Sequence, residues 1–370
     1  MSAPIRVAVL GAGSVGREVV RALLERADEL RAADGSPIVL AGVAVRDVAR
    51  AAAAGIPEAL LTDAPAHLVA DPDTDVIIEL MGGDEPAHTF ISAALAAGKP
   101  VVTANKHVIA LHGAELEATA RRTGTPLRFE AAVGGGIPVL GPIAADLAAN
   151  RLDALRGIVN GTTNFILTAM SREARAYADV LADAQVAGYA EADPAGDVEG
   201  HDAANKLVIL ARLAFGQWLA PASIGLAPWA VGGIHGLPGI TGVTLPDIQA
   251  AAEQGFAIKL VAAAVRTQDG ITAAVLPSAV DRGSPLGRTD GVLNRIEVDG
   301  SPIGSVAFAG PGAGGAATSS AVLADLVAIS RQGGSTWAGL RTASGPVAAG
   351  QPPDGDAFVG PSGLAYPVIR

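Results

Sequence analysis

Residues 7–20 read VAVLGAGSVGREVV, and this stretch decides the fold of the first part of the chain. An apolar run precedes three glycines, Gly11, Gly13 and Gly16, and an amphipathic segment follows them. Gly11 permits a tight turn, Gly13 lets the backbone approach a pyrophosphate, and Gly16 allows a helix to pack closely on a strand. Since a strand before and a helix after the glycines are the required context, the pattern predicts a dinucleotide-binding loop. A plain strand–turn–helix corner is the alternative.

Short apolar runs alternate with helical segments on both sides of this loop and on to residue 132. The strand candidates are Ile5–Leu10, Ile38–Val45, Asp75–Leu80, Pro100–Ala104 and Pro126–Ala132, and the helix candidates include Ser14–Arg31, His88–Ala97 and Ala114–Arg122. Such alternation is typical of βαβ units on a parallel sheet. We therefore predict an α/β fold in which residues 1–133 form a dinucleotide-binding domain with a Rossmann-type, doubly wound parallel sheet.

The composition changes at residues 133–143 (VGGGIPVLGPI), whose glycines and prolines indicate a loop leaving the first domain. Helix and strand candidates then follow in mixed order, among them a helix over His201–Phe215 and strands over Ile271–Leu276 and Val292–Val298. They predict a second, α+β domain over residues 134–305.

Two segments follow this second domain. Residues 310–330 are a glycine loop that leads into a predicted helix. Residues 333–370 are rich in Gly, Pro, Ala and Ser with weak periodicity, so we expect a tail that is mostly irregular or partly ordered against the body.

The composition excludes several classes of protein. Half of the 370 residues are hydrophobic, 17% are charged, and the formal net charge is −11 without a Lys/Arg cluster, so we expect no nucleic-acid partner. The absence of cysteine excludes disulfides, a thiol nucleophile and zinc–thiolate sites, and it fits a reducing, cytoplasmic compartment. The sequence has no run of eighteen apolar residues, so we expect no membrane span. A strand that starts at Ile5 leaves no room for a signal peptide, so we expect none.

The second predicted strand ends in Arg46–Asp47, where a dinucleotide-binding domain meets the adenosine ribose. An acidic residue there binds the 2′-hydroxyl of NAD, whereas an arginine suits the 2′-phosphate of NADP. Arg46 favours NADP(H), with NAD(H) possible. The alternative is that Arg46 is a solvated loop charge.

An acidic cluster precedes one lysine in the segment AEADPAGDVEGHDAANKLVIL, residues 190–210. The carboxylates are Glu191, Asp193, Asp197, Glu199 and Asp202. Asp202 and Lys206 are spaced i,i+4 on the predicted helix, which suits either a surface salt bridge or a lysine poised to transfer a proton. The preceding acids have three interpretations: a calcium-like site whose spacing does not match an EF-hand, a solvated turn, or a pocket for the ammonium of an amino acid.

Residues 184–211 (AQVAGYAEADPAGDVEGHDAANKLVILA) resemble the signature of homoserine dehydrogenases. Further matches follow in the family's order: GAGSVG, ELMGG (Glu79–Gly83), VVTANK (Val101–Lys106), FEAAVGGGIPV (Phe129–Val139), GIVNGTTNFIL (Gly157–Leu167), FAIKLVAAA (Phe256–Ala264) and GPGAGG (Gly310–Gly315). The resemblance covers residues 5–332 and implies NAD(P)-dependent interconversion of L-homoserine and L-aspartate 4-semialdehyde, a step toward threonine, methionine and isoleucine.

The resemblance also implies roles for particular residues. Lys206 donates and accepts the proton, and Asp202 orients the substrate and Lys206. Lys106 lies beside the nicotinamide and the substrate. The implied substrate-binding residues are Glu191, Asp197, Thr162 and Tyr189. The implied cofactor-binding residues are Gly11, Gly13, Val15, Gly16, Arg46, Gly82, Thr103, Lys106, Gly312 and Gly314. A monovalent cation, usually sodium, is implied at Glu130, Val133, Gly135 and Ile137, with an ion-free interdomain hinge as the alternative.

The resemblance further implies that residues 306–332 return to the nucleotide domain and that the second domain forms a homodimer. Because the tail is too short for an ACT regulatory domain, we expect none, and no threonine feedback through one. Two rivals stay open, namely a dehydrogenase of another small amino or hydroxy acid and a catalytically inactive NADP-binding protein.

Overall fold

The computed structural model describes residues 3–27, 29–32, 35–228, 236–351 and 355–370, and the chain divides into two units. The first consists of Met1–Leu147 and Ala313–Gly345, and the second of Ala148–Gly312 and Pro346–Arg370. The first unit therefore extends past the boundary that the sequence placed after residue 133. The reason is local, because Glu130 binds the backbone at the start of the next helix and keeps that helix in the first unit.

The first unit contains a six-stranded sheet in which every neighbouring pair is parallel. Its strands are β1 (Ile5–Leu10), β2 (Ile38–Ala44), β3 (Leu61–Thr62), β4 (Val76–Glu79), β5 (Val101–Thr103) and β6 (Leu127–Arg128). The spatial order β3-β2-β1-β4-β5-β6 reverses direction between β1 and β4. This is the predicted doubly wound arrangement, in which ligands bind beyond the carboxyl ends of the strands at that reversal.

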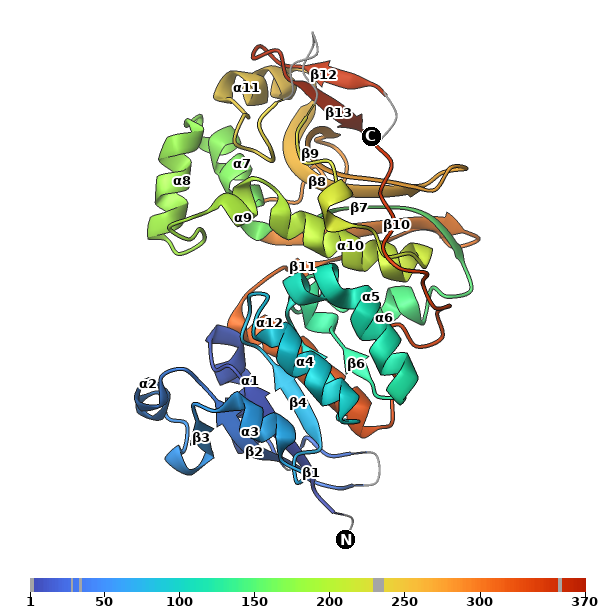
Figure 1. Cartoon of the computed structure of the whole chain (residues 1–370). Helices are drawn as coiled ribbons and strands as arrows, with labels where there is room; N and C mark the ends of the chain where they lie inside the picture. Colours follow the sequence, from blue (N-terminus) through green and yellow to red (C-terminus); the bar gives the residue numbers. More distant parts are fainter. Residues whose placement is uncertain (1–2, 28, 33–34, 229–235, 352–354) are drawn as a thin grey trace. The chain divides into compact units, whose positions relative to one another are not determined.

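The helices of this unit connect its strands and cover the sheet. They are α1 (Ser14–Glu25), α2 (Val48–Ala53), α3 (Pro65–Ala70), α4 (Ala87–Ala96), α5 (Lys106–Thr123), α6 (Leu140–Ala144) and α12 (Gly315–Ser330), with 3-10 turns η1 (Glu58–Leu60) and η2 (Glu130–Ala132). α1 packs against α12, and α4 packs against α3 and α5 (Figure 1). Val322 and Leu326 of α12 enter the same apolar core as Val7 and Val19, so the late helix belongs to the nucleotide-binding unit.

The second unit is α+β, as predicted. Its sheet has the order β11-β10-β7-β8-β9-β13-β12, and only β9 and β13 pair in parallel. The strands are β7 (Arg151–Ile158), β8 (Phe256–Arg266), β9 (Ile271–Asp281), β10 (Leu293–Ser301), β11 (Gly304–Pro311), β12 (Ala357–Val359) and β13 (Ala365–Ile369). The helices are α7 (Gly161–Glu173), α8 (Tyr177–Val186), α9 (Ala195–Val198), α10 (His201–Phe215) and α11 (Leu245–Glu253), with the 3-10 turn η3 (Pro221–Ser223). α7, α10 and α11 all contact β8.

In the described part of the chain, no helix is both long and apolar enough to cross a bilayer.

The tail is partly ordered against the body, the second of the two predicted alternatives, and its residues 352–354 lie outside the described ranges. β13 adds to the sheet beside β9, and β12 pairs with β13 (Figure 1). Asp247, at the start of α11, holds this hairpin: its carboxylate accepts hydrogen bonds from the Ser362 N–H (2.9 Å) and the Tyr366 hydroxyl (2.9 Å). The same carboxylate completes a capping box with Thr244. The tail is ordered by contacts distant in sequence, which periodicity does not reveal.

We expect Asp247→Asn to destabilise the second unit by about 3 kcal/mol at neutral pH, because the amide turns a donor toward groups that themselves donate. Burial alone would raise the pKa of Asp247, but its hydrogen bonds hold that pKa below its ordinary value. The carboxylate therefore stabilises the fold fully above about pH 4, and this contribution disappears as the pH falls through the lowered pKa. The unfolding temperature of the variant should lie below that of wild type at neutral pH, and this difference should become smaller in acid. Tyr366→Phe, which removes one donor, should cost about 1 kcal/mol. A gap independent of pH would contradict this role.

Candidate functional site

The glycine loop has the geometry that the sequence predicted for phosphate binding. Gly11 lies at φ +100°, and a Cβ there would come 2.6 Å from the Leu80 carbonyl oxygen. Gly13 has open space around its α-carbon and precedes the first turn of α1, where no side chain caps the helix. The N–H groups of that turn are therefore available to an anion. Gly315 of α12 lies against the same loop, since a Cβ there would come 2.7 Å from the Ser14 carbonyl oxygen.

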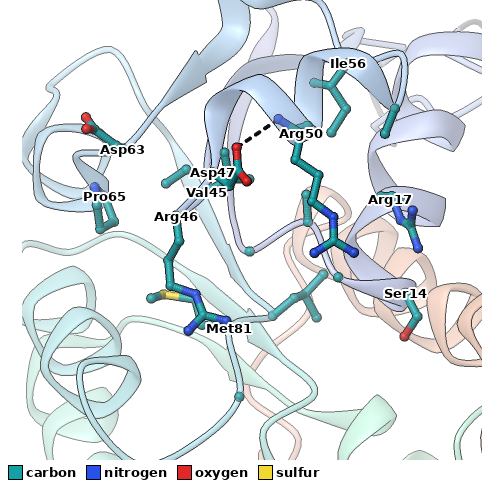
Figure 2. A pocket seen from close by; sticks show the side chains of 18 of the residues that line it. Ser14, Arg17, Val45, Arg46, Asp47, Arg50, Ile56, Asp63, Pro65 and Met81 are labelled. Carbon is teal, nitrogen blue, oxygen red and sulfur yellow. Dashed lines mark hydrogen bonds between the residues drawn. The ribbon is translucent and has the colours of Figure 1, made fainter.

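A cavity of about 670 Å³ adjoins this loop. Three arginines line it: Arg46 and Arg50 from the β2–α2 side, and Arg17 from α1 (Figure 2). Asp47, the acidic residue beside Arg46, accepts a hydrogen bond from the Arg50 N–H (2.9 Å) and caps α2. The Asp47 carboxylate thus serves the helix. The cavity is also lined by Asp63 and Glu85, so its charge is mixed, and the three guanidinium groups are the lining groups that suit the phosphates of a nucleotide.

The carboxyl ends of β4 and β5 are organised by a buried acid, Glu79. Its carboxylate accepts hydrogen bonds from the Thr103 hydroxyl (2.6 Å) and from the N–H groups of Met81 (2.7 Å) and Gly82 (3.3 Å). Burial raises the pKa of Glu79, against these hydrogen bonds. Gly82 lines the cavity, whereas the fully buried Thr103 directs its hydroxyl toward Glu79.

Lys106 begins α5 directly beyond β5. The preceding residue, Asn105, accepts from the Val108 N–H (3.2 Å) to cap the helix and donates its side-chain amide to the Gly83 carbonyl (2.8 Å). Lys106 is half-buried. This lysine therefore occupies the edge of the sheet at which parallel α/β domains bind their ligands.

The residues predicted to hold a cation form a buried loop within the first unit. Glu130 accepts hydrogen bonds from the N–H groups of Val139 (2.7 Å), Leu140 (2.8 Å) and Gly141 (2.7 Å). Burial raises its pKa, and the nearby Asp325 carboxylate adds to that shift.

The carbonyls of Val133, Gly135 and Ile137 belong to buried residues and accept no hydrogen bond from residues within the described ranges. A carboxylate with unpaired carbonyls is a donor set for a hard cation. The loop residues therefore fit the predicted ion.

In the second unit, the structure brings Asp202 and Lys206 together on α10. The Lys206 ammonium donates to Asp202 Oδ2 (2.7 Å) and to the Val159 carbonyl (2.6 Å), and both side chains are about nine-tenths buried. A lysine has three N–H donors, and the third finds no acceptor among the residues that the structure describes. Lys206 is thus a buried amine held in place by two acceptors, with one hydrogen-bond donor available to a ligand.

Asn160, at the start of α7, connects two of the predicted acids. Its side-chain amide donates to Asp197 Oδ1 (2.7 Å) and to Asp202 Oδ2 (2.8 Å), while its Oδ1 accepts from the Thr163 N–H (2.8 Å) and caps the helix. Asn160 therefore links Asp197 to Asp202, the carboxylate that accepts the hydrogen bond from the Lys206 amine.

The structure brings some of the other predicted substrate-binding residues together and leaves others apart. The Thr162 hydroxyl donates to the Tyr189 carbonyl (2.8 Å), so these two residues lie together. The Glu191 carboxylate is exposed and forms no hydrogen bond or ion pair with the described residues. Asp193 and Glu199 hold local structure, since Asp193 accepts from the Ala195 N–H (3.2 Å) and Glu199 contacts His201 (3.3 Å). The acidic cluster is therefore partly structural and partly turned toward the lysine.

The late glycines differ in what surrounds them. Gly312 is the last residue of the segment Ala148–Gly312 of the second unit, and it packs against Asn294, whose side chain leaves no room for a Cβ. Gly314, at φ +117° with open space around it, precedes α12 in the first unit. Val15 is the second residue of α1, just beyond the glycine loop. Gly312 has a packing reason to be glycine, whereas Gly314 and Val15 lie next to residues of the glycine loop.

Comparison with known families assigns both units. A family model described as the NAD-binding domain of homoserine dehydrogenase matches residues 11–130, and a second, described as homoserine dehydrogenase, matches residues 138–327. The chain belongs to the homoserine dehydrogenase family. It is accordingly an oxidoreductase that uses a nicotinamide cofactor.

Homoserine dehydrogenases of several bacteria resemble this chain over most of its length. That of Corynebacterium glutamicum is 42% identical, over 91% of this chain and 76% of its own length. That of Mycobacterium tuberculosis is 44% identical, over 89% and 73%. Among solved structures, the homoserine dehydrogenase of Thiobacillus denitrificans superposes with a TM-score of 0.82 at 41% identity, over 89% of this chain and 73% of that one.

Three polar residues of this family member escaped the sequence analysis, although they organise the site. Glu79 binds the turn after β4, Arg50 lines the cavity, and Asn160 bridges two acids. Glu79 and Asn160 lie in the motifs ELMGG and GIVNGTTNFIL, so their positions in the sequence could have indicated them. Arg50 lies on α2, whereas Arg46 precedes the Asp47 cap of that helix, so helical periodicity does not relate the two arginines.

Proposed function

We propose that the chain interconverts L-homoserine and L-aspartate 4-semialdehyde with a nicotinamide cofactor. The observation that carries this proposal is the buried Lys206–Asp202 pair, which offers one unsatisfied N–H, with Asn160 linking Asp202 to a second carboxylate, Asp197. This arrangement suits a small substrate with an oxygen that gains or loses a proton and an ammonium that seeks negative charge.

Lys206 transfers the proton in this proposal. In the direction of reduction, its ammonium donates a proton to the carbonyl oxygen as that oxygen becomes a hydroxyl. In oxidation, the neutral amine takes the proton back. The bound nicotinamide supplies or accepts the hydride. Asp202 and the Val159 carbonyl hold the amine in place, and Asn160 keeps Asp202 oriented.

The remaining predicted residues keep their roles as proposals. Glu191 and Asp197 bind the substrate ammonium, and Thr162 with the Tyr189 backbone contacts the rest of the substrate. Lys106, at the start of α5, lies beside the nicotinamide and the substrate. The phosphates lie on the glycine loop, and the arginines of the cavity favour NADP(H), with NAD(H) accepted less well.

Sodium at Glu130 and the carbonyls of Val133, Gly135 and Ile137 is likewise proposed. We expect Glu130→Gln to abolish a specific thermal stabilisation by sodium, because the amide removes the negative charge. The measurement compares the unfolding temperature in sodium chloride and in choline chloride at equal ionic strength. Wild type should gain stability in sodium alone. Equal gains in wild type and variant would place the ion elsewhere.

The assembly and the cellular setting also remain proposals. We propose a homodimer that forms through the second unit, which sedimentation at micromolar protein tests directly. A net charge of −11 supports the absence of a nucleic-acid partner, and a cysteine-free chain supports a cytoplasmic location.

The decisive experiment follows the absorbance of the reduced nicotinamide while the purified chain is given L-homoserine with NADP or NAD at alkaline pH. Homoserine-dependent reduction is the expected result. A folded chain that binds NADP but reduces it with other small hydroxy or amino acids, or not at all, would favour a different substrate or a non-catalytic role.

A further inference from the structure

Two histidines and a glutamate converge on the surface of the first unit, and no role assigned so far uses them. His88, near the start of α4, stacks on His112 of α5 with ring centroids 3.9 Å apart and planes inclined by 17°. One nitrogen of each imidazole and one carboxylate oxygen of Glu115 lie within 4.8 Å of one another. His112 and Glu115 share one face of α5 at i,i+3 spacing, and α4 packs alongside that helix (Figure 1).

One ring nitrogen of each histidine lies beside a carboxylate oxygen. His112 Nε2 lies 2.8 Å from Asp84 Oδ1, and His88 Nδ1 lies 3.3 Å from Glu85 Oε1. A histidine that binds a metal characteristically gives its other ring nitrogen to a carboxylate, which fixes the tautomer and strengthens the ligand. Both rings of this cluster have that second contact.

His88 Nε2 is the atom that most needs a partner. It is buried and forms no hydrogen bond with the described part of the chain. Its nearest carboxylate oxygen, on Glu115, is 3.8 Å away, beyond hydrogen-bonding distance. A buried ring nitrogen without a partner requires an explanation, and an electrophile at the centre of the cluster provides one.

We propose that His88, His112 and Glu115 bind a divalent transition-metal ion of the zinc class, with Asp84 and Glu85 orienting the two imidazoles. Two imidazole nitrogens and one carboxylate oxygen form a donor set that suits Zn²⁺, and three protein ligands leave a position for water. Zn–N bonds are about 2.0–2.1 Å long, so the ion draws the ligand atoms closer together. Glu115, whose side chain is 65% exposed, is able to make that movement.

The ion would connect elements that also shape the nucleotide site. It joins α4 to α5, and Asp84 lies in the turn whose Gly83 carbonyl accepts the Asn105 amide (2.8 Å). Asn105 caps the helix that begins with Lys106. Metal binding therefore stabilises the first unit directly and rigidifies the turn that contains Gly82.

The test uses the untagged full chain, freed of metal with a chelator, and zinc chloride as the probe. Calorimetry should show one zinc ion per chain at this cluster, and His88→Ala or His112→Ala should abolish that binding. Asp84→Asn keeps the size of the side chain and touches no ligand atom, yet it should weaken zinc binding by about 10–100-fold, because it no longer fixes the His112 ring. His67→Ala, which removes an exposed histidine on α3, is the matched control and should bind zinc like wild type.

Two further readouts separate a metal site from a structural cluster. Zinc should raise the unfolding temperature of wild type and His67→Ala but not of His112→Ala. Cobalt substituted for zinc should give a visible absorption band that His88→Ala lacks. Zinc affinity equal in wild type, His112→Ala and Asp84→Asn would overturn the proposal, as would a wild-type chain that binds no zinc.

Discussion

Replacing Lys206 with methionine is expected to lower kcat by about 10²–10⁴-fold, the range that a positioned general acid–base group contributes. Methionine keeps the apolar stem and removes the amine that donates to Asp202 and Val159. NADPH binding should persist, because the glycine loop and the arginine-lined cavity lie in the other unit. Turnover with homoserine and NADPH titration by fluorescence measure the two properties separately.

A second buried lysine of the same unit provides the matched control. Lys259 donates to Asn164 Oδ1 (3.1 Å), to the Thr289 carbonyl (2.7 Å) and to Asp290 Oδ1 (2.7 Å), so the fold uses all three of its donors. Burial lowers the pKa of Lys259. Lys259→Met should therefore lower the unfolding temperature, whereas the kcat of the folded molecules stays near wild type. If Lys206→Met instead retains kcat within a few-fold, the proton comes from another group.

Much of the fold was predictable where a local pattern was strong. The apolar run before the glycines gave β1 with its observed bounds, and the periodic apolar face after His201 gave α10 with its observed bounds. α5 was predicted to begin at Ala114, but it begins at Lys106, because Asn105 supplies a cap that the pattern of apolar residues does not include. Helix starts depend on such single side chains, so periodicity finds the middle of a helix more surely than its ends.

Features that depend on distant contacts escaped prediction. β12 and β13 are short, and β9, with which β13 pairs, lies far away in the sequence, so a Gly- and Pro-rich tail gave no sign of them. Glu130 was expected as a metal ligand alone, yet its three backbone contacts also hold α6 in the first unit. The role of Asp47 was readable in principle, because an aspartate before a helical segment is a common N-cap.

The discrimination between NADP and NAD should depend on Arg46 and Arg50. Both guanidinium groups line the cavity beside the glycine loop, and Asp47, the residue that would bind a ribose 2′-hydroxyl, already caps α2. The double change Arg46→Ala/Arg50→Ala is expected to raise KM for NADPH by about 100-fold, since charge-assisted hydrogen bonds to the 2′-phosphate are lost. KM for NADH should change little, because NADH lacks that phosphate.

Arg21→Ala is the control for the loss of positive charge, since Arg21 is exposed on α1, pairs with Glu18 and does not line the cavity. It should leave both KM values close to wild type. The initial rate at varied NADPH and NADH, each at saturating L-homoserine, gives the four constants for each variant. Equal losses for NADPH and NADH in the double variant would assign the arginines to the pyrophosphate, which both cofactors share, and the preference for NADP would then require another cause. A loss confined to NADPH would identify the β2–α2 turn as the element that selects the cofactor.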